Sequence, residues 1–85
     1  MNRQKIEVTG NLLDNMMDGK DVTGTRLCML TAINYTKGIK LIKRLVGFGA
    51  IDEMFNSGGL ITYKITESGK VLLKEITIMS ELLGY

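Results

Sequence analysis

The 85-residue chain contains no histidine and no proline, and its only cysteine is Cys28. Because histidine is the commonest general base and metal ligand, its absence argues against most catalytic and metal-dependent functions. A single cysteine cannot form an internal disulfide, so nothing indicates a secreted, disulfide-stapled fold. Without a histidine nearby, Cys28 fits a small core residue better than a nucleophile. We therefore expect no enzymatic activity, no metal and no cofactor.

Long hydrophobic runs and low-complexity stretches are also missing. No apolar run approaches the ~20 residues that a membrane helix needs, and the polar start, Met1 to Lys5, does not resemble a signal peptide. With 45% hydrophobic and 24% charged residues, the composition is that of one small globular domain. We expect a cytoplasmic protein.

The net charge of +2 is only mildly basic. Any affinity for nucleic acid must therefore come from where the cations lie rather than from their total number.

Helical spacing and capping residues predict three helices in the first half of the chain. The first covers residues 4–18, with an apolar stripe that ends before Asp18-Gly19; its apolar residues are Ile6, Leu12, Leu13, Met16 and Met17. Thr23 is a suitable N-cap for a short second helix, 24–32, expected to bury Leu27, Leu30 and either Cys28 or Met29. Asn34 similarly precedes a third helix, 35–48, which Gly49 ends. A short helix, a tight turn and a longer helix form a helix-turn-helix.

The hydrophobic period changes after Gly49. Residues 50–55 and 60–66 are β-prone segments separated by the turn sequence 56–59, which predicts a β-hairpin. Thr66 can then cap a final helix that reaches about residue 83. The predicted fold is therefore α+β, a winged helix-turn-helix in residues 1–66, followed by a C-terminal helical element in residues 67–85.

The two halves of the third predicted helix differ in character. One half is apolar: Ile39, Leu41, Ile42, Leu45, Val46 and Phe48. The other half carries one hydroxyl and four cations with no acid between them: Thr36, Lys37, Lys40, Lys43 and Arg44. A cationic helix face fits the major groove of double-stranded DNA, where phosphates flank the helix. The alternative is an ordinary solvated face.

Fewer signals mark contacts outside this helix. Arg26 begins the second helix, where free backbone N–H groups also favour a phosphate. Asn56, Ser57 and Lys64 of the hairpin are further candidates for DNA contact. The hairpin tip carries no cation, however, so an ordinary turn explains it equally well.

The final helix repeats apolar residues at spacings of four, three and four: Leu72, Ile76, Met79 and Leu83. This stripe predicts a dimerisation element. The alternative is that the final helix packs against the first helix to complete the core.

Several segments resemble the small archaeal winged-helix DNA-binding proteins, including dimeric chromatin-associated members. The matching segments are Thr25-Arg26-Leu27, Ala32, Asn34-Tyr35, Gly49-Ala50-Ile51, and Tyr63 to Thr66 leading to Gly69. The resemblance implies a homodimer joined by its last helices, with Lys37, Lys40, Lys43, Arg44 and Arg26 facing DNA. This final helix is shorter than in the long coiled-coil members of that family.

Together these observations predict a double-stranded DNA-binding protein, a small transcriptional regulator or a nucleoid-associated protein. The main alternative is a winged-helix module that binds another protein and no DNA. It is favoured by the modest charge and the uncharged hairpin tip. A small enzyme is the third and weakest reading.

Overall fold

The computed structural model describes residues 3–84 and contains four α-helices, three strands and one short 3-10 turn. In chain order they are α1 (Arg3–Asp14), β1 (Val22–Thr23), α2 (Gly24–Thr31), α3 (Tyr35–Phe48), β2 (Ile51–Phe55), η1 (Ser57–Gly59), β3 (Ile61–Ile65) and α4 (Glu67–Leu83). A helix-turn-helix followed by a β-hairpin is the winged-helix arrangement, so the predicted α+β fold is confirmed.

The predicted N-caps of α2 and α3, and the predicted stop signal that ends α3, form as expected. The side chain of Thr23 accepts a hydrogen bond from Arg26 N, and that of Asn34 accepts bonds from the backbone N of Thr36 and Lys37. Gly49 ends α3 at φ 94°, a left-handed conformation that glycine adopts without a Cβ penalty. α3 therefore begins and ends at the predicted residues.

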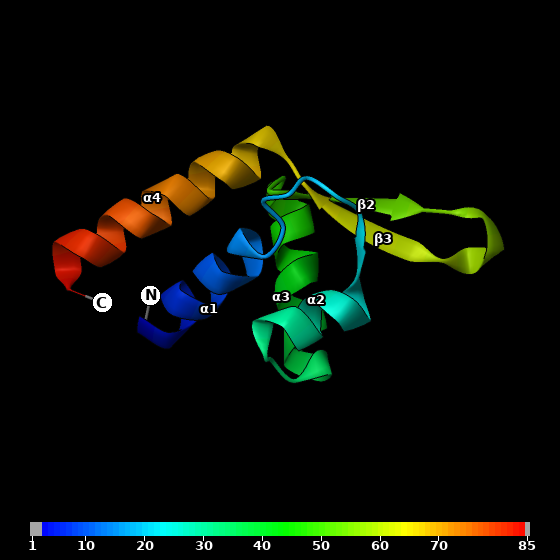
Figure 1. Ribbon diagram of the computed structural model, residues 1–85, viewed down its shortest axis with the longest axis horizontal. Coiled ribbons are helices and arrows are strands. Elements are labelled where there is room, and N and C mark those ends of the chain that lie inside the picture. Colours follow the sequence, from blue (N-terminus) through cyan, green and yellow to red (C-terminus); the bar gives the residue numbers. More distant parts are fainter. Residues whose placement is uncertain (1–2, 85) are drawn as a thin grey trace.

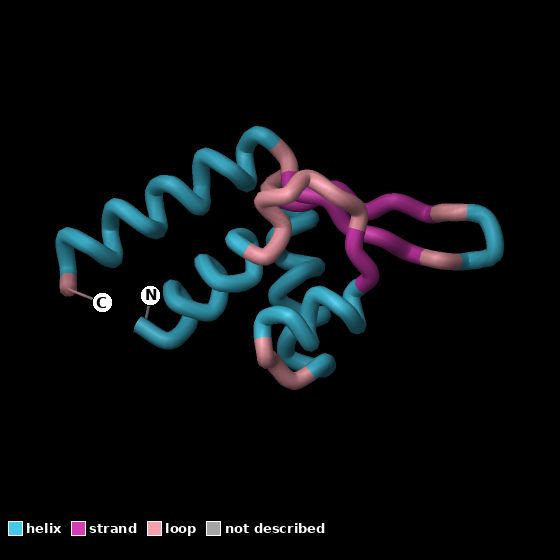
Figure 2. The backbone as a smooth tube through the Cα atoms, viewed as in Figure 1, coloured by secondary structure: helices cyan, strands magenta, loops and turns pink. Residues whose placement is uncertain are grey.

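The three strands form one antiparallel sheet in the order β1-β3-β2. In the hairpin, Glu53 lies opposite Tyr63 and Phe55 lies opposite Ile61. Directly opposite residues share one face of a sheet, so these side chains lie on the same face as Ile51. Figure 2 shows the two long strands running out to a short helical turn at the hairpin end.

One core joins the helices to the sheet. Its fully buried side chains include Leu12, Leu27, Ile42 and Ile51, which come from α1, α2, α3 and β2. In Figure 1, α4 lies beside α1 at one end of the molecule, and the hairpin projects at the other end. The resulting shape is elongated, 44 × 26 × 21 Å.

Some sequence predictions about the helices were wrong. α1 ends at Asp14 rather than residue 18, because residues 15–18 form turns, and Met17 is exposed. Ala32 is not helical but the left-handed C-cap of α2. Leu30 and Phe48, both predicted on apolar faces, are exposed near the C-terminal ends of α2 and α3. Of the two candidates in α2, Cys28 is buried and Met29 is exposed.

Candidate nucleic-acid interface

The close approach of α2 and α3 depends on one glycine. A Cβ atom on Gly38 would overlap the Sγ of Cys28 and lie 3.1 Å from Ile33 Cγ2. Because that atom is absent, α3 packs directly on α2. Ile42 and Leu45, on the same helix as Gly38, are also buried. Burial also raises the pKa of the Cys28 thiol, which keeps it neutral and suits a core side chain. α3 is thereby fixed with its opposite face outward.

The outward face of α3 carries every polar residue predicted for it. The side chains of Thr36, Lys37, Lys40, Lys43 and Arg44 are all exposed. Within residues 3–84, no acidic side chain forms an ion pair with Lys37, Lys40 or Arg44. These three cations are therefore available to a ligand.

The helix-turn-helix carries positive charge without any negative charge. Residues 24–48 contain five of the eleven cations and none of the nine acidic residues of the chain. Arg26 is exposed at the first turn of α2, on the same unit as the α3 cations. This concentration of one sign on one unit makes a local positive field that the net charge of +2 does not reveal.

Lys43 differs from the other cations of α3 because its side chain contacts the hairpin formed by β2 and β3, which is the wing of the fold. Its Nζ donates to Oε2 of Glu53 on β2 at 2.5 Å, and the hydroxyl of Tyr63 donates to the same oxygen at 3.1 Å. The hydrogen bond from Lys43 holds the pKa of Glu53 below its ordinary value, and the bond to Glu53 raises the pKa of Lys43. Burial, and then this hydrogen bond to Glu53, raise the pKa of Tyr63. Lys43 therefore links α3 to the hairpin, and its positive charge is paired with the carboxylate of Glu53.

This three-residue link predicts a pH-dependent stability. Because the folded-state pKa of Glu53 is depressed, its carboxylate stabilises the fold above the ordinary value of about 4.5. That stabilisation is lost as the pH falls through the lower folded-state pKa. We expect Glu53→Gln to lower the melting temperature at pH 7 and to differ less from the unmodified protein near pH 3. Thermal unfolding at both pH values tests this. Asp21→Asn, an exposed control, should change the melting temperature less at pH 7; equal losses would contradict the role of Glu53.

The remaining candidate residues lie on the hairpin. Lys64 is exposed but lies opposite Asp52 in the register. The side-chain amide of Asn56 donates to Thr62 Oγ1 at 2.9 Å and to Leu60 O at 3.4 Å. Its donors are thus engaged inside the hairpin, whereas Ser57 is exposed at the tip. The structure brings these residues to the wing and not to the cationic face of α3.

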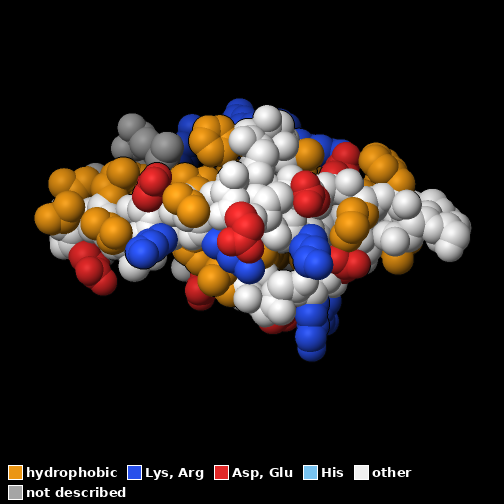
Figure 3. Space-filling view, turned by 90° about the horizontal axis from the view of Figure 1, so that it is seen from above, with side chains coloured by type: hydrophobic (Ala, Val, Ile, Leu, Met, Phe, Trp, Pro, Cys, Tyr) orange, Lys and Arg blue, Asp and Glu red, His pale blue; other side chains and the backbone are white. Residues whose placement is uncertain are grey.

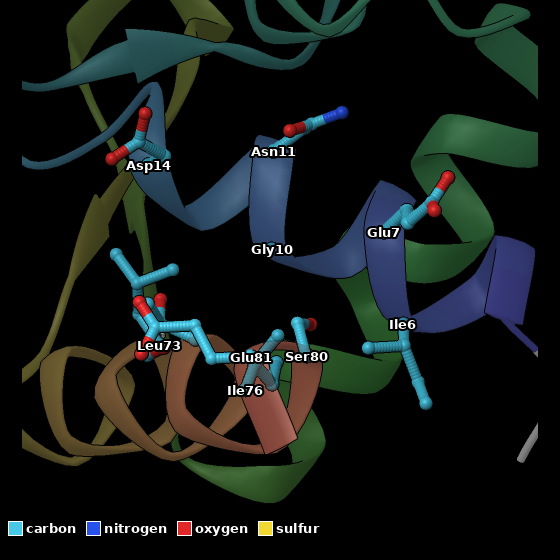
Figure 4. A pocket seen from close by; sticks show the side chains of 10 residues that line it. Ile6, Glu7, Gly10, Asn11, Asp14, Leu73, Ile76, Ser80 and Glu81 are labelled. Carbon is cyan, nitrogen blue, oxygen red and sulfur yellow. Dashed lines mark hydrogen bonds between the residues drawn. The ribbon is translucent and has the colours of Figure 1, made fainter. Parts of the chain in front are cut away.

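A groove lies between α1 and α4. This groove of about 470 Å³ has Ile6, Leu73 and Ile76 among its apolar residues and acidic Glu7, Asp14 and Glu81 among its polar ones. In Figure 4, Gly10 of α1 faces α4, where its missing Cβ would lie 3.2 Å from Ile76 Cγ2. Three carboxyl groups make this groove unsuited to a polyanion, in contrast to α3.

No cluster of three or more His, Cys, Asp or Glu side chains in residues 3–84 could hold a metal ion. None of the helices described combines the length and apolar character of a membrane span.

Comparison with solved structures gives the same fold. The chain is 27% identical to Sso10a-2, a DNA-binding protein from Sulfolobus solfataricus, with a TM-score of 0.85 over 96% of this chain and 83% of that one. MarR from E. coli (16% identity, TM-score 0.70) and the adhesin competence repressor AdcR from Streptococcus pyogenes (19%, 0.70) share the fold. The matches cover 80% and 89% of this chain, but only 52% and 57% of the two regulators. No protein-family model and no curated protein matches the sequence. The resemblance to archaeal winged-helix proteins is confirmed by the Sso10a-2 structure.

Proposed function

We propose that this chain binds double-stranded DNA through the major groove with α3, as a small transcriptional regulator or nucleoid-associated protein. The observation that carries the proposal is the exposed cationic face of α3, on a helix-turn-helix that contains no acidic residue. The similarity to Sso10a-2, a DNA-binding protein, supports it. The residues we assign to DNA are Lys37, Lys40 and Arg44, with Thr36 beside them and Arg26 at the start of α2.

The other candidate contacts have smaller roles in this proposal. Lys43 has its charge shared with Glu53, so we assign it mainly to holding the wing against α3. Lys64 and Ser57 remain candidates for backbone contact from the wing. Asn56 is assigned to the shape of the hairpin because its amide donors already have partners. Lysine and arginine on phosphates give affinity with little base readout, which favours weak sequence specificity.

We further propose that the protein acts as a homodimer through α4. Leu72 and Ile76, two of the residues predicted for dimerisation, are half-buried against the chain's own core. The other two, Met79 and Leu83, are exposed. The alternative prediction, that the last helix packs against the first, therefore describes the face of α4 that carries Leu72 and Ile76.

A different face of α4 is apolar and exposed. Val71, Ile78 and Leu82 are exposed, and with Glu75 they repeat at spacings of four, three and four, the pattern of a coiled-coil seam. Figure 3 shows hydrophobic side chains gathered over this end of the molecule. We assign the seam formed by Val71, Glu75, Ile78 and Leu82, flanked by Met79, to a second copy of the chain.

The dependence of DNA affinity on salt tests the proposed function and the dimer together. A monomer offers four or five cations, so a dimer that engages eight to ten phosphates should show a slope of log affinity on log salt of roughly −7 to −9. Leu82→Glu should give a monomer in sedimentation and a slope of roughly −4. Binding of a duplex of arbitrary sequence, measured by anisotropy between low and moderate salt, gives both slopes.

Three results of this experiment would count against the proposals. No binding at low salt would remove the DNA-binding function and leave the protein-interaction module as the better account of the exposed apolar residues on α4. A slope near −1 would show that the cations do not meet phosphates. A Leu82→Glu variant that stays dimeric would place the interface on another face.

A further inference from the structure

One carboxylate is set against the cationic face of α3 from outside the helix-turn-helix. Residues 24–48 contain no acidic side chain, yet Glu53 of β2 accepts a hydrogen bond from Lys43 Nζ at 2.5 Å. Within residues 3–84, Lys43 is the one cation of α3 that forms a salt bridge. Because the proposed function requires a positive face, this single exception calls for an explanation.

Glu53 is held in place more firmly than Lys43. Its side chain is 15% exposed and also accepts a hydrogen bond at 3.1 Å from the hydroxyl of Tyr63, a buried residue directly opposite it on β3. The side chain of Lys43 is 53% exposed and ends a flexible four-carbon stem. The carboxylate is thus fixed by the sheet, whereas the lysine can turn outward.

The hairpin has a second attachment to α3 besides this ion pair. Ile51 of β2 and Ile65 of β3 are paired at the base of the hairpin, and both are buried in the core that contains Ile42 of α3. An ion pair between exposed side chains adds little to such an attachment. The carboxylate of Glu53 can therefore serve a second purpose, through its charge.

The ion pair adds no net charge to the surface proposed to bind DNA. A phosphate that approaches Lys43 must compete with a carboxylate that already accepts a charge-assisted hydrogen bond. If Lys43 turns to the phosphate, Glu53 is left unpaired beside a polyanion. Either way, each protomer offers four effective cations rather than five. These four are Arg26, Lys37, Lys40 and Arg44.

We propose that Glu53 is an internal competitor of DNA phosphate, which holds Lys43 and keeps DNA affinity below the value that the cations of α3 would otherwise give. This proposal rests on the proposed DNA-binding function. An acid-free cationic surface holds any stretch of duplex through its phosphates. Differences in affinity between variants of one interface lie mostly in the rate of dissociation. The carboxylate of Glu53 therefore shortens the lifetime of the complex and favours release.

Glu53→Gln should raise DNA affinity, whereas the loss of a purely structural contact would leave affinity unchanged or lower it. Glutamine keeps the shape of the side chain and frees the charge of Lys43. In a dimer the number of effective cations rises from twice four to twice five, so the slope of log affinity on log salt should change from about −7 to about −9. At about 0.1 M salt, affinity should rise about eightfold for each protomer that engages DNA. Anisotropy with a duplex of arbitrary sequence measures both, and circular dichroism checks that each variant is folded.

Asp52→Asn is the matched control for net charge. It removes the same charge one residue earlier on β2, where successive side chains point to opposite faces of the sheet. Because the side chain of Asp52 lies on the face away from Glu53, its removal frees no cation of α3. Affinity should change by less than about threefold, since a charge outside the interface is screened at this salt.

A double variant, Lys43→Gln with Glu53→Gln, tests the proposal without relying on the single substitution. It removes both members of the ion pair, so affinity should stay within about threefold of that of the unmodified protein. A Lys43 that already contributes a full charge to the interface would instead make this variant weaker by about eightfold for each protomer. That result would overturn the role of Glu53.

The remaining outcomes separate this proposal from the proposed function. No binding at low salt by the unmodified protein would contradict DNA binding itself. Steep salt dependence together with an affinity that Glu53→Gln leaves unchanged or lowers would overturn the role of Glu53 alone. Equal gains from Glu53→Gln and Asp52→Asn would show a response to total charge, which also overturns it.

Discussion

Replacing Lys40 and Arg44 together with alanine is expected to reduce affinity for double-stranded DNA by roughly three to four orders of magnitude at about 0.1 M salt. In a dimer the double substitution removes four cations from the proposed interface, each of which contributes about 0.9 log unit at that salt. The slope of log affinity on log salt should become shallower by about 3.5. Both side chains are exposed and, within residues 3–84, unpaired with acids, so folding should be preserved.

The control for this experiment removes the same charge elsewhere. Lys70→Ala with Lys74→Ala takes two cations from α4, and Lys70 is already paired with Glu67. Affinity should fall by less than about threefold, because surface charges distant from the interface are screened at this salt. Equal losses in both double variants would show a response to total charge rather than to the face of α3. Unchanged binding after the α3 substitutions would mean that another surface meets DNA.

Gly69→Ala is expected to lower the free energy of unfolding by about 3 kcal/mol, at the upper end of the cost of overpacking. A Cβ atom there would overlap the carbonyl oxygen of Ala50 and lie 2.7 Å from Ile65 Cγ1. The backbone of Ala50 cannot withdraw freely, since its carbonyl accepts a hydrogen bond from Thr66 N at 3.1 Å. For a domain of this size the melting temperature should fall by about 12–24 °C.

Gly47→Ala is the matched control, with the opposite expected sign. Gly47 is exposed in α3, and a Cβ atom added there meets nothing within 4 Å. Alanine should therefore stabilise the helix by about 0.5–1 kcal/mol. Chemical denaturation of both variants gives the comparison. A neutral Gly69→Ala would show that α4 can shift away from Ala50 at little cost.

Local signals explain why the fold could be predicted from the sequence. Thr23, Asn34 and Thr66 each precede a helix whose backbone N–H groups they satisfy, and Gly49 ends α3 in the left-handed region. These interactions span only a few residues, so the sequence alone reports them. β1 was missed because two residues are too few to show a period, and its pairing with β3 is a tertiary contact.

The parts of the site that were not predicted depend on contacts between distant residues. The cationic face of α3 follows from helical spacing alone, but the neutralising partner of Lys43 lies ten residues away, on β2. Similarly, the spacing in α4 predicts one apolar stripe, Leu72, Ile76, Met79 and Leu83, without showing which of these residues the rest of the chain covers. Leu72 and Ile76 pack against the core, whereas Val71, Ile78 and Leu82 are exposed.

Thr66 joins two parts of the molecule that the proposed function uses separately. Its hydroxyl accepts a bond from Gly69 N to start α4 and donates to Gly49 O at 2.6 Å, at the residue that ends α3. The helix proposed to bind DNA and the helix proposed to bind a second copy are thus connected directly through Thr66, in addition to the hairpin that joins them along the chain. In a dimer formed through α4, this connection leaves little freedom to change the distance between the two α3 helices. We therefore expect DNA binding to tolerate changes of DNA sequence more readily than an inserted half turn of duplex between the two contact sites.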